Sequence, residues 1–258
     1  MRSTIPSGSN QSNPTAPDAG RRVGIYAPSV AGCIIGRWHQ SGCASRYHAT
    51  VNTDCAVGRD TANHSDCCFV AVDVETANAS LASICEIGMV SFASTGVVEG
   101  WQTLVNPGDR FDPVNVSIHG IDESAVNQAP RFPDVAPRIS ALLHGKTVVS
   151  HMAFDRVALN RACEKHNLPS IDCTWLDTAR VCRRAWPKFA RRGYGLAAIA
   201  SWCGIQFDHH RAQEDARAAG SILLCAVSAT GLSVSDWVVR SRQPIGPYGL
   251  TAGGARRW

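Results

Sequence analysis

The sequence predicts an α/β protein in which helices cover a mixed β-sheet. Three successive runs alternate apolar and polar residues and are joined by short links, which is typical of an antiparallel meander. They are FVAVDVE at 69–75, SICEIGMVSFA at 83–93 and VVEGWQTLVNP at 97–107. Helical segments follow, and they flank a short apolar run, TVVSH at 147–151, which we interpret as a buried strand. An antiparallel group followed by alternating helices and strands indicates a mixed sheet.

The remaining elements are predicted from periodicity and from the residues that start or end helices. After a connector at 113–121, Asp122 opens a short helix, and Gly145 and Pro169 end two later ones. The pattern over 175–187 is mixed between strand, turn and helix. The predicted helices cover 122–130, 135–144, 154–168, 195–205 and 212–229.

Composition divides the chain into three segments. Residues 1–66 begin rich in Ser, Asn, Pro and Gly and show no periodicity, so we expect a disordered or poorly structured extension. The folded domain is expected over 67–230. Gly, Pro and Arg return in 231–258, which predicts a loose C-terminal tail.

Bulk properties favour a protein with an ordinary core in a reducing compartment. Hydrophobic residues make up 45% of the chain, charged residues 18%, and the formal net charge is +4. The eleven cysteines are odd in number and contain no Cys-x-x-Cys pair, so we expect free thiols rather than disulfides or zinc ligands. No run of apolar residues is long enough to span a membrane. We therefore expect a cytoplasmic protein without a membrane partner.

The first candidate site residues are Asp73 and Glu75 at the end of the first predicted strand. Two residues apart on a strand, their side chains share one face, and Phe69 and Ala71 belong to the same face. Acids in an apolar row are unfavourable unless a cation neutralises them. The alternative is a solvated strand end, because an Asp-x-Glu pair alone is a weak signal.

Three further candidates also stand at the ends of predicted elements. Asp155 starts a helix after a strand, where the helix dipole alone could account for an acid. His210 precedes the final helix and Asp215 lies in its first turns, and a polar loop would explain the histidine equally well. Taken together, four carboxylates and one imidazole match a pair of divalent cations with a general base, as phosphodiester hydrolysis requires.

These motifs, in this order, resemble the DEDDh branch of the DnaQ-like 3′–5′ exonucleases, a family that includes the proofreading subunit of bacterial DNA polymerase III and RNase T. The resemblance covers about residues 68–230. It rests on FVAVDVETA with SICEIGMV, on IHGI at 118–121, on VVSHMAFDRVAL, on LDTAR at 176–180 and on HRAQEDARAAGSILL.

The resemblance implies a ribonuclease H-like fold and a role for each residue. Asp73 would bridge two Mg²⁺ or Mn²⁺ ions, and Glu75 and Asp215 would complete the ion that holds the nucleophilic water. Asp155 would support the second ion and His210 would be the general base.

One departure concerns the second motif, which in the family often reads His-Asn-x-x-Phe-Asp. Ser150 and His151 stand at the His-Asn places, so the substrate contact there is expected to differ. Substrate contacts are predicted at Thr76, His151 and Phe154.

A basic and aromatic stretch from Arg180 to Tyr194 is predicted to bind the substrate. Cations for phosphates and aromatic faces for bases are what a single-strand binder combines. A solvated basic face is the alternative. The stretch contains the predicted contacts Arg183, Arg184, Arg191 and Arg192.

The sequence leaves three functional hypotheses. The leading one is a metal-dependent 3′–5′ exonuclease acting on single-stranded DNA ends and releasing nucleoside monophosphates. The second keeps the fold but takes RNA or short oligonucleotides, and the third is a nucleic-acid-binding module without activity. A DNA polymerase is a candidate partner, although neither tail contains a readable polymerase-binding segment.

Overall fold

A computed structural model describes residues 68–245, and it contains one five-stranded sheet. The strand order is β3-β2-β1-β4-β5, with β1 in the centre. β1, β2 and β3 pair antiparallel, whereas β4 and β5 run parallel to β1. The predicted meander and the predicted mixed sheet are therefore both confirmed. The strands are β1 (Phe69–Thr76), β2 (Ile84–Ala93), β3 (Gly96–Leu104), β4 (Thr147–Ser150) and β5 (Thr174–Asp177).

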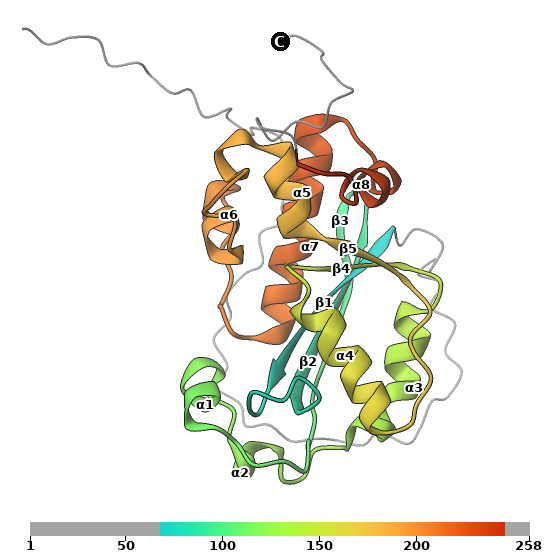
Figure 1. Ribbon diagram of the computed structural model, residues 1–258, viewed down its shortest axis with the longest axis vertical. Helices are drawn as coiled ribbons and strands as arrows, with labels where there is room; N and C mark the ends of the chain where they lie inside the picture. Colours follow the sequence, from blue (N-terminus) through green and yellow to red (C-terminus); the bar gives the residue numbers. More distant parts are fainter. Residues whose placement is uncertain (1–67, 246–258) are drawn as a thin grey trace, which may run out of the picture. The chain divides into compact units, whose positions relative to one another are not determined.

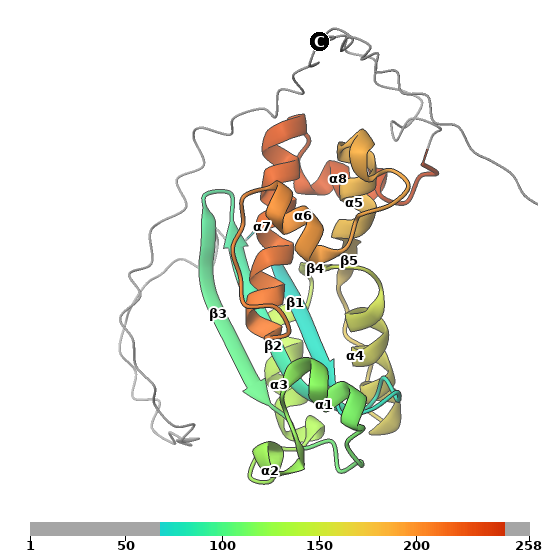
Figure 2. The same ribbon diagram turned by 90° about the vertical axis from the view of Figure 1, so that its left-hand side faces the viewer.

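Helices cover both faces of this sheet (Figure 1). One apolar cluster joins β1 and β2 to α3 and α4, and a second joins the opposite face to α5, α7 and α8. α6 packs on α7 in a third cluster, and Figure 2 shows α7 lying along the sheet. The helices are α1 (Pro113–His119), α2 (Glu123–Val126), α3 (Phe132–Leu143), α4 (Phe154–Lys165), α5 (Thr178–Ala185), α6 (Leu196–Trp202), α7 (Ala212–Thr230) and α8 (Val234–Arg240), with a 3₁₀ turn at Pro187–Phe189.

The two faces of β1 explain why acids occur in it at all. Val70, Val72 and Val74 alternate inward toward the α3 and α4 side, and each is at most 2% exposed. Phe69 and Ala71 are buried on the other face, toward α7. The same alternation places the acids at 73 and 75 on the α7 side, just where that face passes out of the core.

α7 approaches β2 so closely that only glycine fits between them. A Cβ atom built on Gly88 would collide with the backbone of Ala212 and Gln213, at the start of α7. Glu86 lies two residues before Gly88 on the same strand, and its carboxylate accepts a hydrogen bond from the amide of Ala212 at 3.1 Å. These contacts hold the first turn of α7 against the sheet.

Two short helices correct the sequence prediction. Residues 113–121 were predicted as a connector but contain α1, which starts with the Asp112 side chain accepting a bond from the Val114 amide. Asp before Pro113 is a helix-start signal, and Gly120 ends the helix with a φ of 75°.

The second correction concerns the loose tail predicted from residue 231. That prediction is wrong for α8, whose Ser233 and Asp236 form a reciprocal cap and whose Trp237 is 1% exposed in the α7-side core. The predictions for residues 1–66 and for the end of the tail, 246–258, lie outside the described residues.

Two expectations about composition can be compared with the described residues. The seven cysteines between 68 and 245 are all free thiols. No single helix in this range is long and apolar enough to cross a membrane. Taken together, α7 and α8 have that length and composition, but the pair is bent by 94° at the break between them.

The approach of α7 to β2 makes Gly88 a sensitive position. Gly88→Ala should lower the free energy of unfolding by about 2 kcal/mol or more, because backbone atoms cannot move aside as a flexible side chain could. Gly195→Ala is the matched control, since its Cβ would meet open space, and it should change stability by less than about 1 kcal/mol. Chemical denaturation measures both, and equal values for the two variants would contradict the packing argument.

Candidate active site

Asp73 and Glu75 lie at the carboxyl end of the central strand. β4 pairs with β1 only as far as Ala71, so the last residues of β1 extend beyond their parallel neighbour. Both acids are partly buried, and the Glu75 side chain is 13% exposed. They therefore line the edge of the α7-side core rather than a fully solvated strand end.

Asp215 reaches the same place from the first turn of α7, where it is 2% exposed. The amide of His210 donates to Oδ2 at 2.8 Å, and Nδ1 of His209 donates to Oδ1 at 2.7 Å. The backbone of His210 has a φ of 67°, in the left-handed region that side chains with a Cβ rarely adopt. The loop before α7 is thus folded onto this carboxylate.

Asp155 comes from α4, the helix that follows β4. It lies in the first turn of α4, is 2% exposed, and its Oδ1 accepts a hydrogen bond from the Val74 amide at 3.1 Å. Val74 lies beyond the part of β1 that pairs with β4. The carboxylate of α4 therefore takes the place of a strand partner next to Asp73.

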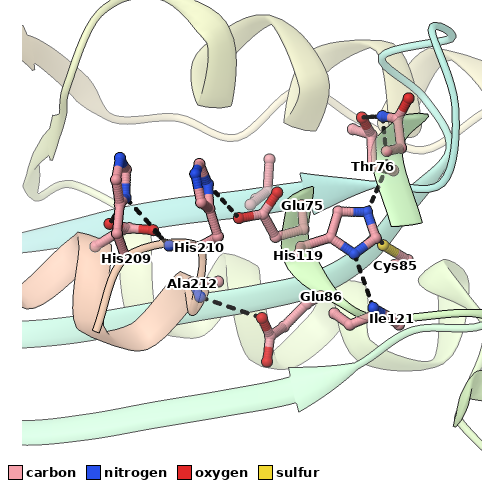
Figure 3. Close-up of polar contacts among 12 residues, drawn as sticks. Glu75, Thr76, Cys85, Glu86, His119, Ile121, His209, His210 and Ala212 are labelled. Carbon is pink, nitrogen blue, oxygen red and sulfur yellow. Dashed lines mark hydrogen bonds and ion pairs between the residues drawn. The ribbon is translucent and has the colours of Figure 1, made fainter. Parts of the chain in front are cut away.

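The predicted residues converge. Asp73, Glu75 and Asp215 each present an oxygen, and these three oxygens lie within 4.8 Å of one another. Nδ1 of His210 lies 4.0 Å from Oε1 of Glu75 (Figure 3). Asp155 is outside this group of three. Its charge nevertheless raises the pKa of Asp73 more than the charge of any other residue does.

Burial and mutual repulsion make the carboxylates weak acids. Burial, followed by the charges of Asp155, Asp215 and Glu75, raises the pKa of Asp73 well above its usual value. Burial is also the main cause that raises the pKa of Glu75 to about 8 and that of Asp155 to about 7. Burial raises the pKa of Asp215 too, and His209 opposes this. Without a counter-ion the site would hold protons near neutral pH.

This donor set fits a hard divalent cation. Mg²⁺ and Mn²⁺ prefer oxygen ligands, and the carboxylates of Asp73, Glu75 and Asp215 present three within the span of one coordination shell. A cation would also remove the repulsion that raises their pKa values. A second group, His209, His210 and Asp215, also has its ligand atoms within 4.8 Å of one another. That group combines nitrogen and oxygen ligands.

The IHGI segment supports the end of β1. His119 is buried, its Nδ1 accepts from the Ile121 amide at 3.0 Å, and its Nε2 donates to the Thr76 carbonyl at 3.2 Å (Figure 3). Asn115 of α1 also donates to that carbonyl, at 2.9 Å. Thr76 itself is 4% exposed, so α1 fixes the backbone that carries Glu75.

Two residues of the site were missed by the sequence reasoning. Glu86 is a buried acid directly opposite Glu75 in the register of β1 and β2; burial raises its pKa, and the Ala212 amide opposes this. An acid inside an apolar strand run was the available signal. His209 stacks on His210 with ring centroids 3.9 Å apart. Adjacent histidines looked interchangeable in the sequence. The structure shows that His209 bonds Asp215 through its ring, whereas His210 does so through its backbone amide.

His151, where the chain departs from the family motif, bridges protein groups. Its Nε2 donates to the Tyr194 carbonyl at 2.8 Å, and its Nδ1 lies 2.8 Å from the Thr178 hydroxyl. Burial lowers its pKa. The ring therefore ties the end of β4 to the loop of Tyr194, while neighbouring Phe154 is 43% exposed beside Asp155.

The predicted arginine contacts occupy different environments. Arg191 and Arg192 are exposed, and the guanidinium of Arg183 lies 4.6 Å from the centre of the Tyr194 ring. Arg184 is only 4% exposed and donates to the carbonyl oxygens of Arg180 and Gln243. The structure thus places Arg184 inside the fold rather than on an open surface.

Comparison with known proteins defines the family. Residues 70–223 match a family model described as exonuclease. The DNA polymerase III PolC-type of Caldanaerobacter subterraneus subsp. tengcongensis is 32% identical over 160 residues, which make up 60% of this chain and 11% of that protein. The chain thus corresponds to a small part of the polymerase relative.

Solved structures share the fold. Exonuclease X in complex with 5′ overhanging duplex DNA superposes with a TM-score of 0.55 and 24% identity, covering 67% of this chain and 99% of the other. The nuclease domain of 3′hExo, a DEDDh family member bound to rAMP, gives a TM-score of 0.51 and 17% identity, covering 63% and 92%. These likenesses confirm the predicted ribonuclease H-like fold.

The family match covers more than half of the chain. This protein therefore belongs to the exonuclease family.

The raised pKa values predict how stability depends on pH. An acid whose pKa is higher in the folded than in the unfolded protein binds extra protons when folded, so stability falls as pH rises from its ordinary pKa to the raised one. With Glu75 at about 8 and Asp155 at about 7, metal-free protein should lose roughly 5 °C or more in Tm between pH 5 and pH 8.5. Thermal melts in EDTA measure this.

Two comparisons isolate the carboxylates from other titrating groups. Asp73→Asn removes one repelling charge, so its Tm should depend less on pH than that of wild type. Mn²⁺ should raise the Tm more at pH 8.5 than at pH 5, because protons compete for the same oxygens. A Tm that rises with pH in EDTA would contradict the assignment.

Proposed function

We propose that the protein hydrolyses phosphodiester bonds at the 3′ ends of single-stranded DNA with the help of two divalent metal ions. The observation that carries this is the convergence of Asp73, Glu75 and Asp215 within 4.8 Å, with Asp155 behind them, in a chain of the exonuclease family. Four carboxylates from β1, α4 and α7 repel one another and are unfavourable together unless they bind a cation.

Each residue of the site has a definite task in this reaction. Asp73, Glu75 and Asp215 would hold metal directly, and Asp155 would support a second ion while its Oδ1 stays bonded to the Val74 amide. Bound metal supplies positive charge for the phosphoryl oxygens and makes water a better nucleophile. Water attacks phosphorus, the bond from phosphorus to the 3′ oxygen of the preceding nucleotide breaks, and a nucleoside monophosphate leaves.

His210 is placed to accept the proton of the attacking water. Its side chain is 43% exposed and lies beside Glu75, so it is accessible to solvent and near the metal ligands. Imidazole is half-protonated close to neutral pH, which suits a general base. His209, with Nδ1 engaged by Asp215, has the task of holding that carboxylate.

The surroundings suit an unpaired strand. Exposed Phe154 offers a ring beside Asp155, and Arg183, stacked on Tyr194, lies in the segment that His151 ties to the site. Arg191 and Arg192 extend the positive charge. Aromatic faces with nearby cations bind single strands with little sequence preference.

An RNA substrate is the second candidate. One neighbour of the same fold was solved with rAMP and another with DNA, so the fold is found with both sugars. Matched DNA and RNA oligonucleotides digested side by side would separate the two, and we expect faster release from DNA. The relatives of PolC type also make a DNA polymerase a candidate partner, which co-purification with a replicative polymerase would test.

The metal mechanism predicts loss of activity in two independent ways. Asp73→Asn should reduce nucleotide release from a single-stranded 3′ end by at least about 10²-fold, because it removes the central ligand. EDTA should abolish release, and added Mg²⁺ or Mn²⁺ should restore it. Wild-type rates in both experiments would refute the mechanism. No release by the wild-type protein with Mg²⁺ or Mn²⁺ present would instead favour a nucleic-acid-binding module without activity.

The adjacent histidines provide a matched pair for the general base. His210→Asn should lower kcat by about 10²- to 10⁴-fold and remove the acidic limb of the pH–rate profile. Asparagine tolerates left-handed backbone, so folding should be preserved. His209→Asn should keep the acidic limb. If instead the limb vanishes with His209→Asn and persists with His210→Asn, the roles are reversed.

A further inference from the structure

A cavity of about 520 Å³ lies between α5 and the segment that follows α8. It is separate from the carboxylate cluster, and both of its walls contribute arginine. Asp177, at the start of α5, and Gln243, after α8, also line it. Its arginines are Arg180, Arg183 and Arg184 from α5 and Arg242 from the segment after α8.

The cavity carries a large excess of positive charge. Four guanidinium groups face one carboxylate, a formal excess of three positive charges. Within residues 68–245 none of these arginines forms an ion pair with an acid. Oδ1 of Asp177 already accepts from the amides of Met152, Ala179 and Arg180, so the one acid is committed to the start of α5.

Arg184 makes the positive charge of the cavity more unfavourable in free energy, because this residue is only 4% exposed. Two of its nitrogens donate to backbone carbonyls, but its Nε finds no hydrogen-bond partner in the described part of the chain. Burial, and then the neighbouring charges of Arg180 and Arg183, lowers the pKa of this guanidinium. A buried cation among like charges is stabilised when an anion binds next to it.

The position of the cavity relates it to the catalytic cluster. Asp177 bonds the amide of Met152, three residues before Asp155, so the near end of the cavity adjoins the loop that leads into α4. α5 has eight residues, which makes it about 12 Å long. That length is comparable with a few nucleotides of a strand, since phosphates of one strand of duplex DNA are spaced at ~3.4 Å along the axis.

We propose that this arginine cavity binds a backbone phosphate of the substrate strand, a few nucleotides away from the 3′ end that enters the catalytic site. Planar guanidinium groups suit phosphate oxygens, which they can contact in pairs. The cavity would therefore set the minimum length of strand that the protein binds tightly. The inference rests on the proposed nuclease function, but it concerns binding rather than hydrolysis.

The test is the affinity of the full chain for a labelled single-stranded DNA of about ten nucleotides, measured by fluorescence anisotropy in EDTA over a range of salt. Arg180→Gln/Arg242→Gln changes two exposed members and leaves buried Arg184 in place. We expect binding about tenfold weaker than wild type and a salt slope smaller by about 0.7 to 1.4. Arg138→Gln/Arg161→Gln, on α3 and α4, removes the same charge elsewhere and should leave both quantities near wild type.

The alternatives have distinct outcomes. Equal weakening by both double variants would mean that only net charge matters, which overturns the proposal. A cavity that takes free phosphate would show arginine-dependent binding of inorganic phosphate with unchanged binding of the strand, and that also overturns it. Because EDTA stops hydrolysis, failure of the nuclease assay leaves this result standing, and failure here leaves the nuclease assay standing.

Discussion

The contact between the first turn of α7 and β2 is the constraint on which the site depends. Asp215 lies in α7 and the loop of the two histidines leads into that helix, whereas Asp73 and Glu75 belong to the sheet. The backbone-to-backbone approach at Gly88, together with the hydrogen bond from the Ala212 amide to Glu86, holds these two sets close together. A change that moves α7 outward by the width of a methyl group would separate ligands without altering any of them.

That contact also concentrates unfavourable charge. The sheet places two acids at the edge of an apolar face, α7 adds a third, α4 a fourth, and Glu86 a fifth behind them. The fold tolerates this arrangement because the core on both sides of β1 is extensive and apolar. The site is therefore a region where clustered acids reduce stability, and this cost is explained if the site binds the cation of the proposed function.

Sequence reasoning reached most of the fold and the members of the carboxylate cluster, because alternation marks strands and acids in apolar rows are conspicuous. It missed features that depend on tertiary contacts. The burial of Arg184 depends on Gln243, in a segment with no periodicity, and the difference between His209 and His210 depends on one left-handed residue. α8 is short, so only its Ser233–Asp236 cap could have indicated it.

The folded domain extends beyond the part of the chain that matches the family, because Trp237 is buried in its core. The family match ends at residue 223, inside α7, yet the core that includes Phe69 and Leu176 also includes a side chain fourteen positions further on. A fragment cut at the homology boundary would leave that apolar surface open to water, and open apolar surface favours aggregation. Evolutionary comparison of such domains is therefore best carried through residue 241, where this core is closed.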